Sequence, residues 1–246
     1  YTVQKIFDIF AKYLNSDVYA YILLSWLVFS LNSSYFNKYG ECANPILWVY
    51  GKTAKGKTSF MRLIMSLLGS INSDFLSVKG STLKGFLAEL SQKRDFPVVL
   101  DEYNPEFWAE GSKIPLSTIK TIYNRESNSK SNIHDGIEKR EINTTLAVIS
   151  ESIPEDQNVI NRLIPIPFNA IKKGSFADFQ NLWFVREHFS NFLLSAIHVK
   201  ENEILDAVKE SKEIAMGLSD KLKNQADTRI ITSYATLIAC GRLAGI

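Results

Sequence analysis

Residues 51–58 follow the spacing G-x-x-x-x-G-K-[ST], and the sequence on both sides of them favours one local structure. An apolar run at 46–50 precedes them, and apolar residues recur at helical spacing across 60–68. These patterns predict a buried strand, a glycine-containing loop and an amphipathic helix, in that order. Such a loop directs backbone N–H groups and a helix N-terminus toward an anion. The segment therefore predicts an α/β domain with a site for nucleotide phosphates.

Several positions of this loop have an expected role. Gly51 and Gly56 permit turn conformations that a Cβ would hinder. Lys57 can reach the β- and γ-phosphates of a nucleotide, and the Thr58 hydroxyl can ligate Mg²⁺. A glycine turn in a lysine-rich loop is the alternative, which the flanking strand and helix patterns disfavour. The candidate nucleotide-binding residues are Gly51, Lys52, Thr53, Ala54, Lys55, Gly56, Lys57, Thr58 and Ser59.

A second apolar run, 97–100, ends in two carboxylates, Asp101 and Glu102. The segment between the two motifs has room for one strand, expected at 75–79, and one helix, expected at 83–90. Hydrolysis of a nucleotide needs one acid that holds Mg²⁺ and its waters and another that polarises the attacking water. Asp101 fits the first role, with Thr58 as its partner at the metal, and Glu102 fits the second. ATP and Mg²⁺ are therefore the expected cofactors, although a surface acid pair at a strand end is the alternative.

Length and composition limit the possible classes of protein. A chain of 246 residues can form one α/β domain with additional helices, and its net charge of +2 provides no general attraction for nucleic acid. Cys42 and Cys240 lie far apart and form no metal-binding spacing, so reduced thiols are expected. The apolar run 18–31 is short for a membrane span and predicts a buried helix. No signal peptide is visible, so we expect a cytoplasmic protein without membrane attachment.

The segment after the acid pair contains a predicted helix at 114–124 and then a predicted β-hairpin. Asp135-Gly136 is a strong signal for a tight turn between two short strands. The basic residues on or near this hairpin are candidates for DNA contact, and the alternative is a solvated hairpin whose charges are balanced by nearby acids. These candidates are Lys130, His134, Lys139 and Arg140.

The next core strand, expected at 144–150, ends in Ser150 and Glu151. A polar group at this position could sense the γ-phosphate or position the attacking water, and ordinary strand-end capping is the alternative. Arg162 stands before 163–168, a segment whose two prolines predict an edge strand. This arginine could reach the nucleotide of a neighbouring subunit, or it could form a surface salt bridge.

The remaining sequence is predominantly helical, with apolar periodicity across 204–222 and again across 229–246. We predict three parts of the chain: an N-terminal helical region at 1–40, a nucleotide-binding core at 41–170 and a C-terminal helical lid region at 171–246.

Four segments, in their order along the chain, resemble those of the helicases of superfamily three, which are related to AAA+ ATPases. The similarity is greatest to the helicase domains of plasmid, phage and archaeal primase–helicase replication proteins. The acid pair is also similar to the Walker B motif of the ASCE division of P-loop ATPases. The resemblance implies an ASCE/AAA+-like P-loop NTPase, with a central parallel sheet flanked by helices and helical regions at both ends. The four segments are 51–58, 97–102, 144–154 and 161–168.

The resemblance also implies a ring of identical subunits, commonly six, with ATP bound between subunits and single-stranded DNA in a central channel. The family's functional positions fall on Lys57 and Thr58 for phosphate and Mg²⁺, on Asp101 and Glu102 for the Walker B acids, and on Arg162 for an arginine finger. The hairpin at 130–140 matches the family's DNA-contacting element in location.

This sequence departs from the family at Ser150-Glu151, where asparagine is usual. The leading hypothesis is an ATP-hydrolysing replicative DNA helicase or translocase that acts as a ring. A nucleotide-switched AAA+ module without unwinding activity is the alternative, and a small-molecule phosphotransferase is a third that lacks an acceptor site in the sequence. The expected catalytic residues are Glu102, Lys57, Arg162, Ser150 and Glu151.

Overall fold

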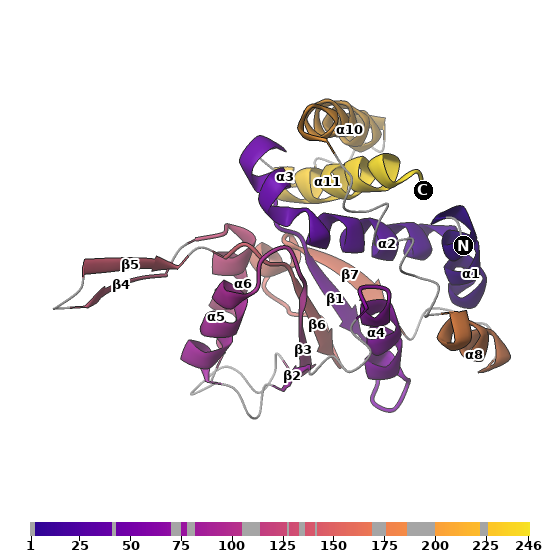
Figure 1. Cartoon of the computed structure of the whole chain (residues 1–246), viewed down its shortest axis with the longest axis horizontal. Helices are drawn as coiled ribbons and strands as arrows, with labels where there is room; N and C mark the ends of the chain where they lie inside the picture. The colour runs from indigo at the N-terminus through magenta and orange to yellow at the C-terminus, as the bar shows by residue number, and fades with distance from the viewer. Residues whose placement is uncertain are drawn as a thin grey trace.

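The centre of the computed structural model is a five-stranded sheet in the order β2-β3-β6-β1-β7, in which every pairing is parallel (Figure 1). Its strands are β1 (Ile46–Tyr50), β2 (Leu76–Ser77), β3 (Val98–Tyr103), β6 (Leu146–Ser150) and β7 (Leu163–Pro167). The structure describes residues 3–40, 43–69, 75–77, 82–104, 114–126, 128–132, 136–140, 142–168, 176–185, 200–221 and 226–246.

Helices cover both faces of the sheet, and a separate hairpin of β4 (Asn128–Asn132) and β5 (Gly136–Arg140) projects beyond α5 and α6 (Figure 1). The helices are α1 (Val3–Leu14), α2 (Asp17–Leu31), α3 (Ser33–Gly40), α4 (Lys57–Ser66), α5 (Leu83–Gln92), α6 (Ser117–Tyr123), α7 (Gln157–Ile160), α8 (Phe176–Val185), α10 (Glu201–Lys221) and α11 (Thr228–Ala244).

Successive residues of each central strand enter opposite cores because side chains alternate across a sheet. In β1, Leu47 and Val49 pack with α1, α2 and α4, whereas Ile46 and Trp48 pack with α5, α6 and α7. Burial on both faces explains why these strands are continuous apolar runs in the sequence. The predicted central parallel sheet flanked by helices is thus confirmed.

Helix α2 is the buried helix that the run 18–31 predicts. Ser16 caps it by accepting a hydrogen bond from the backbone N–H of Tyr19 at 3.3 Å, and residues 23–30 are all buried. The helix is apolar on nearly every side because it lies between the sheet and α11 (Figure 1). Within the described part of the chain, no helix is both long and apolar enough to cross a membrane.

Strand β7 lies at the edge of the sheet, as its two prolines predict. The backbone N–H of Phe168 donates to the carbonyl of Tyr50 in β1 at 2.8 Å. Successive amides of a strand alternate in direction, so Pro165 and Pro167 occupy positions whose N–H would face the open side. The missing donors therefore cost no hydrogen bond within the sheet.

The two terminal groups of helices pack against each other. Helix α11 contacts α2, helix α10 contacts α3, and residues of both groups share one hydrophobic core with the sheet. The Tyr21 hydroxyl in α2 donates to the Ile238 carbonyl in α11 at 3.1 Å. The division into 1–40, 41–170 and 171–246 remains a prediction.

The crossing of α2 and α11 depends on a glycine. A Cβ at Gly241 would lie 2.2 Å from the Tyr21 hydroxyl oxygen and 2.7 Å from the Ser25 Oγ, so Tyr21 or the helix would have to move. We expect Gly241→Ala to lower the free energy of unfolding by about 1–3 kcal/mol through overpacking. Gly217→Ala is the matched control, because Gly217 is also helical but has no atom within 4 Å of the added Cβ.

The control should raise the free energy of unfolding by about 0.5–1 kcal/mol, since alanine is the better helix former. Urea unfolding of both variants, followed by circular dichroism, measures the two effects. Equal stabilisation by the two substitutions would contradict a tight helix crossing at Gly241.

Candidate nucleotide-binding site

The candidate site lies at the carboxyl ends of the parallel strands β1, β3 and β6. Tyr50 pairs with Ser150 in the register of β1 and β6, and the backbone N–H of Gly51 donates to the Ser150 carbonyl at 3.2 Å. The loop after β1 thus begins beside the end of β6. A cavity of about 600 Å³ opens here, which is the size of many small-molecule sites. Its lining comprises residues 53–59, 101–104 and 149–151.

The glycines of the loop adopt backbone conformations that favour glycine. The φ angles of Gly51 and Gly56 are 151° and 84°. Gly56 is also the N-cap residue of α4 and offers no side chain to the first amides of the helix. The helix N-terminus therefore faces the cavity without a side-chain cap, which suits an anion. Both glycines adopt the turn conformations that the sequence predicts, and their contact with a nucleotide remains a prediction.

Lys57 is 8% exposed and folds back across its own loop. Its Nζ donates to the carbonyl of Lys52 at 2.9 Å and also to that of Gly51. Burial lowers the pKa of this lysine, and the negative charges of Glu151 and Asp101 oppose that effect. The ammonium group is thus held inside the loop, where the sequence predicts that nucleotide phosphates bind.

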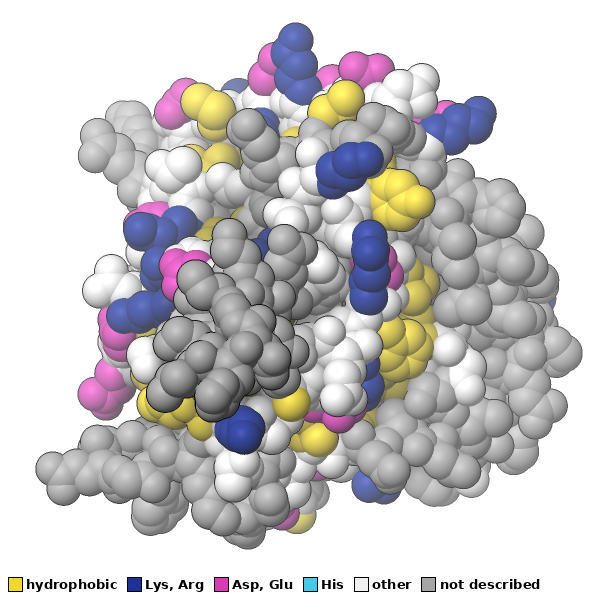
Figure 2. Space-filling view, turned by 60° about the vertical axis from the view of Figure 1, so that its left-hand side comes forward, with side chains coloured by type: hydrophobic (Ala, Val, Ile, Leu, Met, Phe, Trp, Pro, Cys, Tyr) yellow, Lys and Arg dark blue, Asp and Glu magenta, His cyan; other side chains and the backbone are white. Residues whose placement is uncertain are grey.

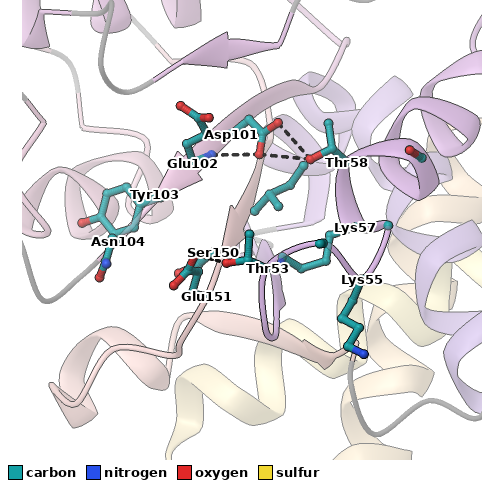
Figure 3. Close-up of a pocket in the computed structure, with 14 residues that line it drawn as sticks. Thr53, Lys55, Lys57, Thr58, Asp101, Glu102, Tyr103, Asn104, Ser150 and Glu151 are labelled. Atoms are coloured by element: carbon teal, nitrogen blue, oxygen red, sulfur yellow. Dashed lines mark hydrogen bonds between the residues drawn. The ribbon is translucent and has the colours of Figure 1, made fainter.

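Thr58 and Asp101 face each other across the cavity (Figure 3). The Thr58 hydroxyl donates to Asp101 Oδ2 at 3.1 Å. A hydroxyl and a carboxylate are hard oxygen ligands, which Mg²⁺ prefers, and this ion normally keeps several waters and binds substrate phosphates as well. In the described residues there is no group of three or more His, Cys, Asp or Glu that could enclose a metal. A hydroxyl beside a carboxylate is a donor set that fits Mg²⁺.

Glu102 lies at a bulge in β3. The pairing of β3 with β6 shifts in register between Leu100 and Tyr103, and Glu102 has a φ of 60°. A left-handed conformation at a non-glycine residue costs about 1–2 kcal/mol. The Glu102 backbone N–H donates to Asp101 Oδ1 at 2.8 Å, and the Ser77 hydroxyl lies 3.5 Å from Glu102 Oε2. Strain of this kind concentrates at functional sites.

Ser150 and Glu151 have different surroundings. The Ser150 hydroxyl donates to the Ser152 carbonyl at 2.8 Å and accepts from the Ser152 N–H at 3.3 Å, which is a strand-end turn. Glu151 instead reaches the phosphate loop, where its carboxylate accepts a hydrogen bond from the Thr53 hydroxyl (Figure 3). The side chain of Lys55 points away from these groups in the same view. Of the two predicted residues at this strand end, Glu151 is the one whose side chain contacts the loop.

Arg162 lies at the start of β7, at the end of the sheet where the parallel strands begin, whereas the cavity lies where they finish. Its carbonyl accepts from the Ile46 N–H at the beginning of β1 at 3.3 Å, so the length of β1 separates it from the phosphate loop. The residue is 7% exposed, and its guanidinium carbon lies 5.5 Å from the centroid of the Tyr123 ring. Among the described residues, no carboxylate is within salt-bridge distance of it. The structure thus keeps Arg162 away from the cavity of its own chain.

The candidate DNA-binding residues lie on or beside the hairpin. The backbone register places Lys130 opposite Glu138 and Lys139 opposite Ser129, and Arg140 ends β5. His134 falls outside the described residues. On the face of the molecule that Figure 2 shows, the described Lys and Arg side chains are scattered among acidic, apolar and uncharged ones. Contact of these residues with DNA remains a prediction.

The bulge at Glu102 and the contact between Thr53 and Glu151 were not predicted from the sequence. No glycine marks the bulge, and the carboxylate reaches Thr53 only because β6 lies beside β1 in the sheet. The sequence gives one indication of the second feature: Ser150-Glu151 stands where the resembled family usually has asparagine, so the contacts at this strand end are expected to differ from those of the family.

No protein-family model and no curated protein matches this sequence. Among solved structures, the active helicase SCCmec type IV Cch is similar over 100% of this chain, with a TM-score of 0.67 and 15% sequence identity. The apo C-terminal region of NrS-1 matches 89% of this chain and 54% of its own, with a TM-score of 0.44 and 17% identity. JCV helicase matches 79% of this chain and 58% of its own, with a TM-score of 0.36 and 14% identity.

The chain spans 47% of the length of the SCCmec helicase. At this identity the likeness shows a shared fold. The α/β fold of this chain, with its five-stranded parallel sheet and flanking helices, is therefore a fold that a helicase also has, as the sequence resemblance predicted.

Proposed function

We propose that this chain binds Mg²⁺ and ATP between the loop 51–59 and the end of β3, and that it hydrolyses the ATP. The contact of Thr58 with Asp101 carries this proposal, since it brings the two predicted Mg²⁺ ligands together in one cavity beside Lys57. Mg²⁺ neutralises charge on the β- and γ-phosphates when it is bound. Lys57 supplies a second positive charge to the same phosphates.

Glu102 then acts as the base in this proposal. It follows Asp101 directly at the bulge, lines the same cavity and can accept a proton from a water that attacks the γ-phosphate. Glu151 lies across the cavity beside Thr53, where it can orient that water or respond to the presence of the γ-phosphate. Ser150 supports the turn that carries Glu151.

We further propose that the chain is a DNA helicase or translocase that acts as a ring of identical copies, most simply six. Three observations support this proposal: the fold shared with a helicase, the hairpin that projects from the sheet, and the buried Arg162 at the end of the sheet away from the chain's own cavity. A neighbouring copy that brings its nucleotide to this end would receive the positive charge of Arg162. The hairpin would contact single-stranded DNA in the channel.

DNA-dependent turnover tests the helicase proposal. We expect single-stranded DNA to raise the rate of phosphate release several-fold, because a protein that moves along DNA hydrolyses ATP faster when DNA is bound. The rate should be measured with and without an oligonucleotide at protein concentrations that form rings, which electron microscopy verifies. Tight ATP-dependent assembly with slow turnover and no stimulation by DNA would contradict a motor and favour a nucleotide-switched module.

A further inference from the structure

Arg162 is a buried cation with few polar contacts. Its Nη1 donates to the Asn158 carbonyl, one turn earlier in the chain, and its Nε is buried without an acceptor among the described residues. Asp227 is close enough for its pKa to be lowered by the charge of Arg162, although the backbone N–H of Arg229 is the larger cause. A buried guanidinium needs well-placed contacts to keep one orientation. In this chain one such contact is with an aromatic ring.

That ring belongs to Tyr123, the last residue of α6. The guanidinium carbon of Arg162 lies 5.5 Å from the ring centroid, which is within the range of a cation–π interaction. The ring is packed in the hydrophobic core on the side of α5, α6 and α7, and only 8% of the residue is exposed. A planar guanidinium that lies over a fixed ring can change its tilt very little.

Helix α11 fixes the ring from the other end. The Tyr123 hydroxyl donates to the Arg229 carbonyl at 3.2 Å and lies 3.4 Å from the Ser233 hydroxyl. Asp227 caps the same helix and accepts a hydrogen bond from the side-chain amide of Asn161, the neighbour of Arg162, at 2.9 Å. Both the ring and the chain next to the arginine are thus attached to the start of α11.

We propose that Tyr123 is a positioning residue for Arg162: its ring, held by α11, orients the guanidinium toward the nucleotide of a neighbouring copy. The inference rests on the proposed function, in which Arg162 acts between subunits. Tyr123 touches no nucleotide itself. It makes the C-terminal helix of one copy a determinant of hydrolysis in the next.

Tyr123→Met tests the role of the ring, because methionine is a flexible apolar side chain that fills part of the same space and removes the π face. We expect the maximal rate of ATP hydrolysis by the assembled protein to fall about tenfold, in line with the strength of a buried cation–π contact. The affinity for ATP should be unchanged, since the phosphate loop lies at the other end of the sheet. Tyr123→Phe is the matched comparison: it keeps the ring but loses the hydroxyl contacts with α11, so it should lose less of the rate than Tyr123→Met.

Mixing two variants separates positioning from general damage. Copies with Tyr123→Met keep an intact phosphate loop, and copies with Lys57→Ala keep an intact Arg162 and Tyr123. Mixed assemblies should therefore regain turnover at each interface that joins the two intact halves. If mixing restores nothing, or if Tyr123→Phe loses as much rate as Tyr123→Met, the positioning role is overturned.

A second series serves if Tyr123→Met does not fold. Phenylalanine analogues with one, two and three ring fluorines at position 123 keep the shape and weaken the negative face of the ring step by step. We expect the maximal rate to fall with each fluorine, and an unchanged rate across the series would overturn the proposal. A mixture of Arg162→Ala and Lys57→Ala copies tests the underlying function separately: failure to regain turnover there would reject action between subunits altogether.

Discussion

Glu102→Gln is expected to bind Mg²⁺ and ATP as well as the unaltered chain and to hydrolyse ATP at least about a hundredfold more slowly, which is the usual contribution of a general base. Glutamine matches glutamate in size but cannot accept the proton of the attacking water at neutral pH. The groups that hold phosphate and Mg²⁺ stay in place, because Lys57, Thr58 and Asp101 make their contacts without the Glu102 carboxylate. Binding and turnover should therefore separate in this variant.

Two measurements are needed: nucleotide affinity with a fluorescent ATP analogue, and phosphate release at saturating ATP. Glu89→Gln is the matched control, since the Glu89 carboxylate pairs with Lys93 at 2.9 Å, does not line the cavity, and its loss should change the rate less than about twofold. If Glu102→Gln hydrolyses ATP within about threefold of the rate of the unaltered chain, the Glu102 carboxylate does not stabilise the transition state of hydrolysis.

Local sequence patterns predicted the elements that carry the phosphate site. The runs 46–50 and 97–100 are continuous in apolar character because both faces of β1 and β3 are buried, and such runs are visible without knowledge of the fold. The helix after the loop was predictable from its apolar spacing. Asp135-Gly136 predicts a hairpin but not its observed register: Asn132 pairs with Gly136, so Gly136 lies in β5 and the expected two-residue turn at these positions is wrong.

Other features depend on residues that are distant in the sequence. The contact of Tyr21 with Ile238 and the close approach at Gly241 bring the two ends of the chain together, and no local pattern marks them. The left-handed backbone at Glu102 follows from the register between β3 and β6.

The same limit explains what the sequence left open about Arg162. The alternatives were a surface salt bridge and a finger for a neighbouring nucleotide, and they differ in burial, which sequence spacing does not reveal. Tyr123 lies in another helix, and its ring meets the guanidinium only after α6 and β7 have packed. A buried arginine without a salt bridge among the described residues disfavours the surface alternative. Its action on a second copy remains a prediction.

Arg162→Ala is expected to lower the maximal rate of ATP hydrolysis of the assembled protein by about a thousandfold, the lower end of the usual effect of an arginine finger. The affinity of the chain for ATP should change little, because β1 separates Arg162 from the loop that binds the phosphates. Arg94→Ala is the matched control, since the Arg94 side chain is 71% exposed and pairs with Asp95, its neighbour in the sequence, at 3.5 Å. That variant should keep the unaltered rate.

The dependence of the rate on protein concentration decides whether Arg162 acts between copies. For the unaltered chain, turnover per subunit should rise as copies assemble, because each phosphate site gains the arginine of a neighbour. Arg162→Ala should assemble without that rise, and Arg162→Lys should recover only part of it, since lysine keeps the charge but lacks the planar group that lies over Tyr123. A full rise in the alanine variant would mean that assembly activates hydrolysis by another group. A loss of rate that is equal in dilute and assembled protein would instead assign Arg162 to the stability of its own chain.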